Sequence, residues 1–313
     1  MPVSSPAATR DIFSVHQSMF LDDLEAANKA QKTLEAYGIA VRQLGEFLRM
    51  TGMPLDPTQL TGEHLREFMR HLGRPVPDGL GLGSSTRNQR FRALSLFFKF
   101  LISQDEIRES PMKNLRAPAV PPVSVPVIKM GDMDKLMHSL NGTDYDSRMD
   151  KAIVSLFIDC GFRISEMVGM TLGALNMEER EMTVLGKGQK TRTVRFTTDT
   201  RKDLNRYLLK RMSHELAETD FLWLGQRGPL TRSGMYRRVV NRCKAAGLPP
   251  VHPHMFRHTF AHEYLRNRGN EGDLMKVTGW TTRAMVDRYG ASAASQRAMD
   301  AHDRFSPRKQ LRY

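Results

Sequence analysis

The chain has 313 residues, of which 40% are hydrophobic and 26% charged, a composition typical of a folded protein with room for two domains. No apolar run approaches the ~18 residues needed to cross a bilayer, and residues 1–10 lack the basic start and apolar core of a signal peptide. The two cysteines, Cys160 and Cys243, are too few for a disulfide framework or a zinc site, so we expect a reducing, cytoplasmic setting.

Positive charge is concentrated in the second part of the chain. The formal net charge is +13, because residues 1–116 hold 15 Lys and Arg against 13 Asp and Glu (net +2), and residues 117–313 hold 32 against 21 (net +11). A basic excess of this kind indicates a polyanionic partner. Since no stretch resembles a helix that lies on a membrane surface, the sequence favours nucleic acid over membrane.

The first 116 residues predict an all-helical domain at 12–116, preceded by a disordered tail at 1–11. Apolar residues recur at three- and four-residue steps in two segments between residues 12 and 50, and again in segments 61–71 and 84–101. We expect Thr33, Thr61 and the run Ser84-Ser85-Thr86 to supply the N-caps of the last three helices. Prolines and glycines separate the helices.

A linker and a second domain follow. Residues 117–127 contain four prolines among small and β-branched residues, which predicts an extended linker. In the domain at 128–313, alternation predicts antiparallel strands around a Gly-Lys-Gly turn. The fold class is therefore mainly α with a small antiparallel β-sheet (α+β). We expect strands at 181–185 and 191–197, and helices at 131–140, 151–160, 199–216, 230–246, 282–289 and 293–302.

One stretch near the C-terminus combines several reactive residue types. His254 and Arg257 are three apart, which puts them on one face of a helix that Pro253 would open. Tyr289 lies nine residues past Trp280, in a segment that is also predicted to be helical. A single histidine or arginine on a helix flank is usually solvated or paired, and a single tyrosine is usually part of a core. The interpretation therefore depends on the combination.

The combination resembles the tyrosine site-specific recombinases, or phage integrase family, whose simple two-domain members include the Cre and Xer recombinases. That family has a Gly-x-Arg-x-x-Glu block, a lysine in a β-hairpin, and a His-x-x-Arg-His block followed by Gly-Trp or Gly-His and a tyrosine nine residues later. Strings at 32–37, 44–48, 86–87 and 93–101 also resemble the family's helical core-binding domain. The matching catalytic positions, in order, are Arg163, Glu166, Lys187, His254, Arg257, His258, Gly279, Trp280 and Tyr289.

The resemblance implies a role for each catalytic position. Arg163 and Arg257 would hold the scissile phosphate, since a guanidinium is planar, always charged and bidentate to phosphate. His254 would donate a hydrogen bond to the phosphate or take the proton of the nucleophile, and Lys187 would protonate the leaving 5′ oxygen. Tyr289 would form a 3′-phosphotyrosine and release a 5′ hydroxyl, on the way to a Holliday junction. The family's reaction needs no metal, ATP or other cofactor.

Three neighbouring positions have less direct roles. Trp280 stands where many members have histidine; indole has one N–H donor and no acceptor, so it can hold a phosphate oxygen but cannot carry a proton. We expect Glu166 to orient Arg163 or its neighbours. His258 follows Arg257 and would point to another face of the helix, so we expect it to be structural.

The resemblance also implies the partners. They are double-stranded DNA recombination sites and further copies of the chain, as a homotetramer in the synaptic complex and a monomer or dimer when free. Family members pass a C-terminal segment to a neighbour, and Met299 is the apolar candidate for such docking here. A bacterial or phage protein of the nucleoid is implied. We expect DNA contacts from Arg87, Asn88, Arg90 and Arg92 at the start of the fourth helix, and from Lys190 and Arg192 beyond the hairpin turn.

Two alternatives stay open. A type IB topoisomerase has a very similar catalytic set, although a separate helical domain and a proline linker fit recombinases better. A non-catalytic DNA-binding protein on the same fold would not need the complete set of catalytic residues. The sequence does not identify the DNA site, nor distinguish integration, dimer resolution, inversion and transposition.

Overall fold

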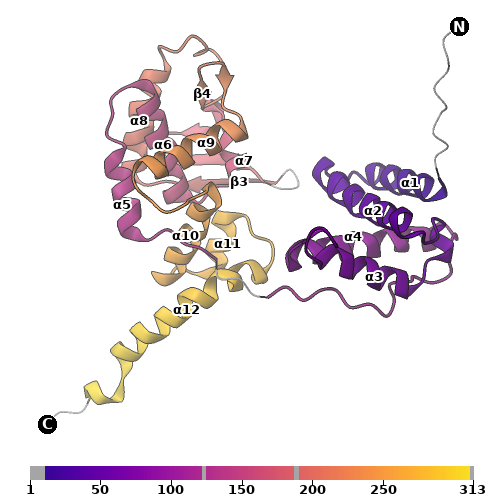
Figure 1. Cartoon of the computed structure of the whole chain (residues 1–313). Helices are drawn as coiled ribbons and strands as arrows, with labels where there is room; N and C mark the ends of the chain where they lie inside the picture. The colour runs from indigo at the N-terminus through magenta and orange to yellow at the C-terminus, as the bar shows by residue number, and fades with distance from the viewer. Residues whose placement is uncertain (1–10, 122–124, 187–189, 311–313) are drawn as a thin grey trace, which may run out of the picture. The chain divides into compact units, whose positions relative to one another are not determined.

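The structure, a computed structural model, describes residues 11–121, 125–186 and 190–310, without the side chains of residues 290–297, 300, 309 and 310. The chain forms two compact units, Met1–Val123 and Ser124–Tyr313, called here the N-terminal and C-terminal units. Both units are mainly helical, and the described strands all lie in the C-terminal unit (Figure 1). The predicted fold class, mainly helical with a small antiparallel sheet, is confirmed.

The N-terminal unit is a cluster of helices around a phenylalanine-rich core. Its helices are α1 Ile12–Ala26, α2 Gln31–Thr51, α3 Gly62–Gly73 and α4 Ser84–Ser103, with a short 3₁₀ helix, η1 Pro57–Gln59. The ring of Phe97 on α4 lies 5.9 Å from that of Phe13 and 5.4 Å from that of Phe20, both on α1. These aromatic pairs hold α1 against α4. The four helices expected in this part of the chain are all present.

The predicted caps of these helices are correct at one position and wrong at two. Thr61 caps α3, and its hydroxyl accepts from the backbone N–H of His64. Thr33 does not cap α2, because the helix starts earlier, after Ala30, and the N–H of Thr33 already donates to the Ala30 carbonyl at 2.7 Å. At α4 the N-cap is Gly83, so the Ser-Ser-Thr run forms the first turn of the helix.

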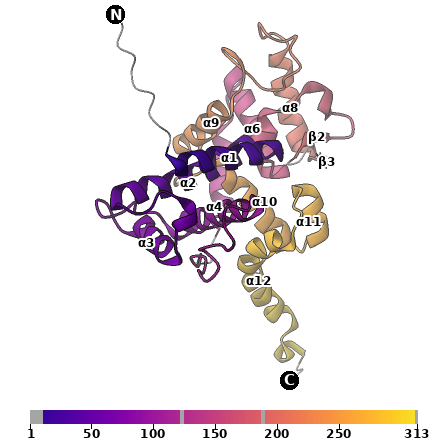
Figure 2. The ribbon, with the colours of Figure 1, turned by 90° about the vertical axis from the view of Figure 1, so that its right-hand side faces the viewer.

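The C-terminal unit surrounds a small sheet with helices. Figure 2 shows α10, α11 and α12 together at one end of this unit, with α6 and α8 toward the other. Its helices are α5 Met130–Ser139, α6 Tyr145–Cys160, α7 Ile164–Val168, η2 Leu172–Ala174, α8 Thr198–Arg211, α9 Arg232–Ala245, α10 Pro253–Arg266, α11 Glu271–Thr278, α12 Arg283–Phe305 and η3 Pro307–Gln310. Its strands are β1 Leu175–Asn176, β2 Glu181–Leu185, β3 Thr191–Arg195, β4 Leu224–Gly225 and β5 Gly228–Pro229.

The main sheet is the hairpin that the sequence predicts, with one added short strand. The order is β1-β2-β3, and all pairs are antiparallel. The first strand of the hairpin has the expected bounds, whereas β3 ends at Arg195 instead of residue 197. The chain turns there because Thr197 caps α8 and its own N–H donates to the Asp159 carboxylate at 2.6 Å.

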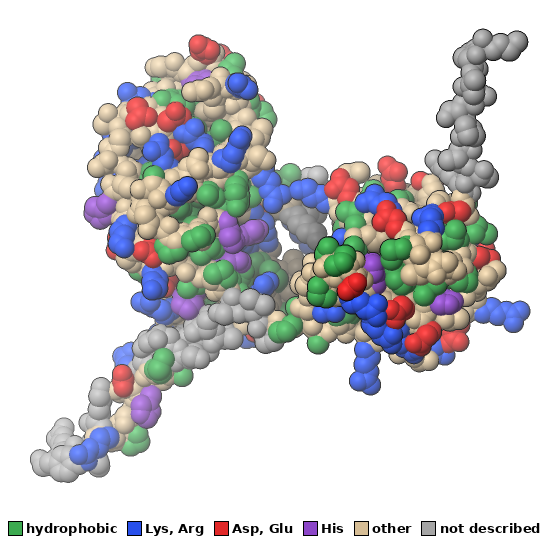
Figure 3. All heavy atoms as spheres, in the orientation of Figure 1, with side chains coloured by type: hydrophobic (Ala, Val, Ile, Leu, Met, Phe, Trp, Pro, Cys, Tyr) green, Lys and Arg blue, Asp and Glu red, His purple; other side chains and the backbone are tan. Residues whose placement is uncertain are grey.

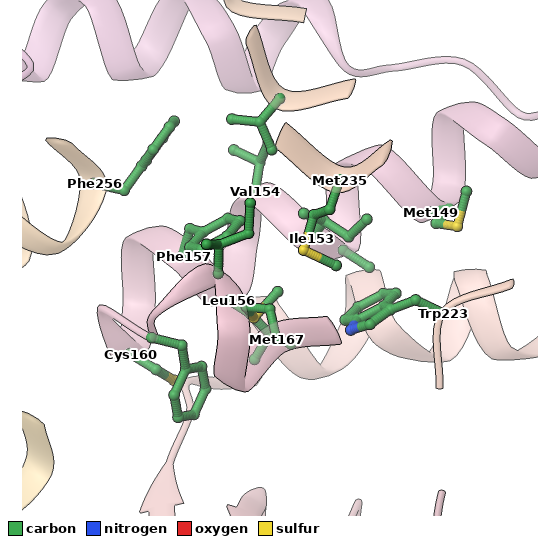
Figure 4. Packing of buried hydrophobic residues seen from close by; sticks show 14 of the residues in the cluster. Met149, Ile153, Val154, Leu156, Phe157, Cys160, Met167, Trp223, Met235 and Phe256 are labelled. Atoms are coloured by element: carbon green, nitrogen blue, oxygen red, sulfur yellow. The ribbon is translucent and has the colours of Figure 1, made fainter. Parts of the chain in front are cut away.

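Helix α6 is the centre of the hydrophobic core of the C-terminal unit. Figure 4 shows its side chains surrounded by Trp223, Met235 and Met167 from later segments. The ring of Phe157 on α6 stacks 5.9 Å from that of Phe256 on α10. Both thiols, Cys160 and Cys243, are buried. The packing fixes the C-terminal end of α6 beside the start of α10.

Gly161 ends α6 in a conformation that a larger residue does not tolerate. Its φ is +59°, in the left-handed region. A Cβ at this position would lie 2.6 Å from Cδ1 of Phe260 on α10. Glycine therefore lets the chain reverse directly against α10, and Arg163 follows two residues later.

Two predicted helices have different ends from those expected. Helix α8 stops at Arg211 rather than residue 216, since the buried Arg211 guanidinium binds carbonyls of the following loop, among them those of Leu222 and Ala217. The segments 282–289 and 293–302 form one continuous helix, α12, instead of two, and its C-terminal half projects from the unit (Figure 1). The three residues between them, Gly290-Ala291-Ser292, include a glycine but no proline, so no backbone N–H needed by the helix is missing there.

No helix in the described parts of the chain is both long and apolar enough to cross a membrane.

Candidate active site

The candidate residues converge from four segments of the C-terminal unit. Arg163 is the N-cap of α7, in the turn after α6, and His254 and Arg257 lie in the first turns of α10. Trp280 follows the left-handed cap Gly279 at the end of α11, and Tyr289 lies on α12. The predicted general acid, Lys187, lies outside the described residues, so its role stays a prediction. Figure 3 shows histidine side chains grouped on the surface of this unit.

Arg257 is the buried centre of the site. The residue is 2% exposed, and its guanidinium donates to the carbonyl of Gly161 at 2.8 Å and to that of Thr278 at 2.6 Å. Its Cζ also lies 5.3 Å from the ring centre of Trp280. Burial, and then the charge of Arg163, lower the pKa of Arg257 to about 9, which leaves the group charged at neutral pH. One side chain thus ties the α6–α7 turn to the end of α11.

Glu166 joins two arginines beside this centre. Its carboxylate accepts from the backbone N–H and from the guanidinium of Arg163, each at 2.8 Å. It also accepts two hydrogen bonds from Arg192 on β3, at 2.8 and 2.9 Å. Burial by itself raises the pKa of Glu166, but the hydrogen bonds from Arg192 and Arg163 outweigh this effect, so the pKa is lowered overall. Glu166 therefore stays ionised and orients Arg163.

Arg192 lies inside the site. Its side chain is 12% exposed, and besides its two bonds to Glu166 its Nε donates to the Val277 carbonyl at 2.8 Å. The guanidinium is held between Glu166 and α11, and DNA contact by Arg192 stays a prediction. The pairing with Glu166 joins residues 26 positions apart, so local spacing does not indicate it.

Substitution of Glu166 by glutamine is expected to lower the free energy of unfolding by about 2–4 kcal/mol at pH 7, because two arginines lose a buried counter-charge. The lowered pKa of Glu166 means that its contribution is complete above the ordinary glutamate pKa and is lost as pH falls through the lowered value. Urea unfolding at pH 7 and pH 3.5 measures this. The difference between wild type and variant should shrink at the lower pH, and Glu63→Gln, at an exposed glutamate on α3, is the control.

His254 lies at the open side of the site. It is exposed at its position on α10, and its ring stacks on that of His258 at 5.9 Å with planes 17° apart. Burial, followed by the charges of Arg257, His252 and Arg163, lowers the pKa of His254, which favours the neutral imidazole in the absence of a phosphate.

Trp280 and Tyr289 form a flat stack. Their ring centres are 4.9 Å apart with planes 5° apart, and the residues are 5% and 4% exposed. Among the described residues, the buried indole N–H of Trp280 has no hydrogen-bond partner. An unsatisfied buried donor is costly, so this N–H is suited to a ligand oxygen.

The hydroxyl of Tyr289 lies 2.7 Å from Nδ1 of His258. Burial raises the pKa of Tyr289, while the charges of Arg288, Arg257 and Arg163 act in the opposite direction. This contact, with the stacking on His254, corrects the expectation that His258 points to another face of the helix, while its expected structural role is not tested by it. A spacing of four from His254 to His258 places both on one side of a helix, and that signal was available in the sequence.

The predicted DNA-contacting residues of α4 fall into two groups. Arg92 is exposed, as is Lys190 near the hairpin. Asn88 donates to the Pro118 carbonyl at 2.8 Å, and Arg90 donates to the Gln43 side chain at 2.8 Å and to the Ala36 carbonyl. The guanidinium of Arg87 packs over Gly73, at the end of α3. DNA contact by these residues stays a prediction.

A helical unit joined to a mixed unit, with a buried tyrosine beside two arginines and two histidines, is the arrangement of an enzyme that transfers DNA strands through a tyrosine. The comparisons agree. The model of the phage integrase family matches residues 127–296, and that of the phage integrase N-terminal SAM-like domain matches residues 18–107. The chain belongs to the phage integrase family.

Relatives and solved structures point the same way. The chain is 30% identical to tyrosine recombinase XerC of Ralstonia pickettii, with 92% of each chain covered, and 29% identical to tyrosine recombinase XerC 1 of Ralstonia nicotianae, with 98% and 99% covered. Its fold is similar to that of XerH recombinase in a post-cleavage complex with difH DNA, at a TM-score of 0.73, 17% identity and 91% and 84% coverage. The Tn1549 transposon integrase with transposon-end DNA gives a TM-score of 0.71, 23% identity and 93% and 99% coverage.

Proposed function

We propose that this phage integrase family enzyme is a site-specific DNA recombinase in which Tyr289 attacks the scissile phosphodiester. The observation that carries the proposal is the position of the phenol, whose ring lies against Trp280 and whose hydroxyl contacts His258, with the charges of three arginines acting on it. A phenol with an unperturbed pKa of ~10 needs such neighbours to react at neutral pH.

The phosphate would be held by four donors. Arg163 is partly exposed and oriented by Glu166, so it can offer a guanidinium edge to a non-bridging oxygen. Arg257 supplies a fixed positive charge behind it, and His254 adds a neutral donor at the open side. The unpaired N–H of Trp280 would complete the set. Fixed donors stabilise the charge that develops on the phosphate oxygens during attack.

The reaction would proceed in two transfers. Tyr289 attacks phosphorus, a 3′-phosphotyrosine forms, and the 5′ oxygen leaves with a proton that the predicted acid Lys187 would supply. Because the phosphotyrosine link retains the bond energy, a 5′ hydroxyl from a second duplex can displace the tyrosine without ATP. Exchange of two pairs of strands passes through a Holliday junction.

The DNA partner is supported by family and by charge. The XerH and Tn1549 integrase structures are complexes with DNA, and this chain carries a net charge of +13. We assign the helical domain at 12–116 to DNA binding, the linker to 117–127 and catalysis to 128–313. Exposed Arg92 and Lys190 would contact phosphates.

The assembly is proposed to be a tetramer on two DNA sites, linked by C-terminal segments. Helix α12 extends from the C-terminal unit with Met299 and Phe305 56% and 64% exposed. A groove of about 360 Å³ on the same unit is lined by apolar residues that include Met133 and Phe260, and by the acidic residues Asp159, Asp199, Asp203 and Glu263. The end of α12 from a neighbouring copy, with Arg304 beside Phe305, would offer this groove an apolar ring and a positive charge.

A suicide substrate tests the proposed function. A duplex from the native locus, nicked just downstream of the cleavage point, loses its short 5′-hydroxyl fragment and traps the covalent complex. We expect an adduct on a denaturing gel, with the DNA attached to the peptide that contains Tyr289 by mass spectrometry. Relaxation of plasmid DNA that lacks the site, with no exchange between paired sites, would indicate a topoisomerase instead.

A further inference from the structure

The side chain of His258 is in direct contact with the hydroxyl group of Tyr289. Its Nδ1 is 2.7 Å from the Tyr289 hydroxyl, a short and direct hydrogen bond, and its ring centre is 5.2 Å from that of the tyrosine. The bond joins α10 to α12, two helices that also share an apolar cluster including Leu265 and Val286. The imidazole of His258 therefore contacts Oη of Tyr289, which is the atom that would attack phosphorus.

The protonation state of His258 suits an acceptor. Burial, then the charge of His254, then those of Arg288, His252 and Arg257 lower the pKa of His258 to about 4. The titratable and charged groups that act on His258 are therefore His254 and Arg257 on α10, His252 in the preceding loop, and Arg288 and Tyr289 on α12. At neutral pH the ring is uncharged, and in the tautomer that carries its hydrogen on Nε2 the free Nδ1 can accept the hydrogen bond from the Tyr289 hydroxyl.

Bound DNA would weaken the effect of the neighbouring positive charges on the pKa of His258. A phosphodiester placed among Arg163, Arg257 and His254 neutralises part of the positive charge that lowers the pKa of His258. Its basicity therefore increases only when the phosphate is present. This makes the imidazole a base that becomes effective at the moment of reaction, whereas the free enzyme keeps a neutral, protonated phenol.

The two histidines of α10 would then have separate tasks. Arg163 is among the charges that act on His254, while Arg288, next to the tyrosine, is among those that act on His258. His254 is exposed at the phosphate side, and His258 is half-buried against the phenol.

We propose that His258 is the general base of the cleavage step and the general acid of the rejoining step. As the bond from Tyr289 Oη to phosphorus forms, the Oη–H proton moves to Nδ1 of His258, and the bond from phosphorus to the 5′ oxygen breaks. In rejoining, the 5′ hydroxyl attacks and gives its proton back to the predicted acid Lys187, while the bond from phosphorus to Oη breaks and the proton on His258 returns to the phenolate. This inference rests on Tyr289 being the nucleophile.

The rate of cleavage by His258→Asn, measured across pH on the suicide substrate under single-turnover conditions, tests the proposal. Asparagine can still accept the phenol hydrogen bond but cannot take the proton. We expect a loss of about 100-fold or more at pH 7, and a rate that rises about tenfold for each pH unit between 6 and 8.5, because the phenolate must form beforehand. The wild-type rate should vary much less over this range.

A second substrate distinguishes loss of the proposed base, His258, from loss of the predicted acid, Lys187. With sulfur in place of the bridging 5′ oxygen, the leaving group needs no proton, so Lys187→Ala should regain activity while His258→Asn should not. A His258→Asn rate within twofold of wild type, a pH profile parallel to that of wild type, or rescue by the sulfur substrate would each overturn the proposal.

Controls keep this result distinct from failure of the proposed function. DNA affinity and thermal unfolding of His258→Asn should match wild type, and His258→Gln serves if the first variant is unstable. His138→Asn, at an exposed histidine on α5, should behave as wild type. If wild type itself forms no adduct, or if the adduct maps to another residue, the assignment of Tyr289 fails rather than that of His258.

Discussion

Replacing Tyr289 by phenylalanine should abolish covalent attachment to DNA. The variant keeps the ring that stacks on Trp280 and loses only the hydroxyl that contacts His258, so the site should stay assembled. No neighbouring group offers a second phenol at this position, and the expected loss is at least about 10⁴-fold in cleavage rate. The adduct on the suicide substrate, followed over hours on a denaturing gel, is the measurement.

Stability and binding should change little in this variant. The lost hydrogen bond is a single one, worth about 1 kcal/mol. Tyr264→Phe, at a partly buried tyrosine on α10, is the matched control and should form the adduct at the wild-type rate. An adduct that persists in Tyr289→Phe would show that another residue is the nucleophile.

Replacing Arg257 by alanine should impair both catalysis and folding. Catalysis loses a fixed charge beside the phosphate, which is worth about 10²–10³-fold in rate. Folding loses the donor that satisfies the carbonyls of Gly161 and Thr278, and two buried carbonyls left without partners cost about 2–4 kcal/mol together. Single-turnover cleavage and urea unfolding measure the two effects on the same preparation.

The conservative variant separates the two roles of this residue. Arg257→Lys keeps the charge but cannot span both carbonyls with a planar fork, so it should recover part of the stability and little of the rate. Arg266→Ala, at a partly exposed arginine in the last turn of α10 that pairs with Glu263, is the control and should change neither. A normal unfolding free energy in Arg257→Ala would show that the carbonyls find other donors.

The sequence predicted those features that depend on local spacing. The four N-terminal helices, the hairpin strand β2 and the segments carrying Arg163, His254 and Tyr289 follow from apolar periodicity and short motifs. Cap residues were harder to assign, since Thr33 and Ser84 have suitable side chains but lie within the first turn of their helices.

The partners of side chains across the fold were not predictable. The contact between His258 and Tyr289 depends on where α12 packs, 31 residues further along the chain. The buried position of Arg192 on β3 likewise depends on Glu166, which lies on α7. Helical spacing indicates which residues share a face, but not which element covers that face. The merging of two predicted helices into α12 has a similar cause, because propensity sets no definite end where glycine is followed by alanines.

The stack of Trp280 on Tyr289 also gives this enzyme an internal optical reporter. The chain has two tryptophans, and Trp223 is 1% exposed in the hydrophobic core, far along the sequence from the nucleophile. Trp280 instead has the Arg257 Cζ 5.3 Å and the phenol ring centre 4.9 Å from the centre of its own ring. We expect movement of the tyrosine toward a phosphate to alter this stack, so the emission of Trp280 should change on DNA binding while that of Trp223 stays constant.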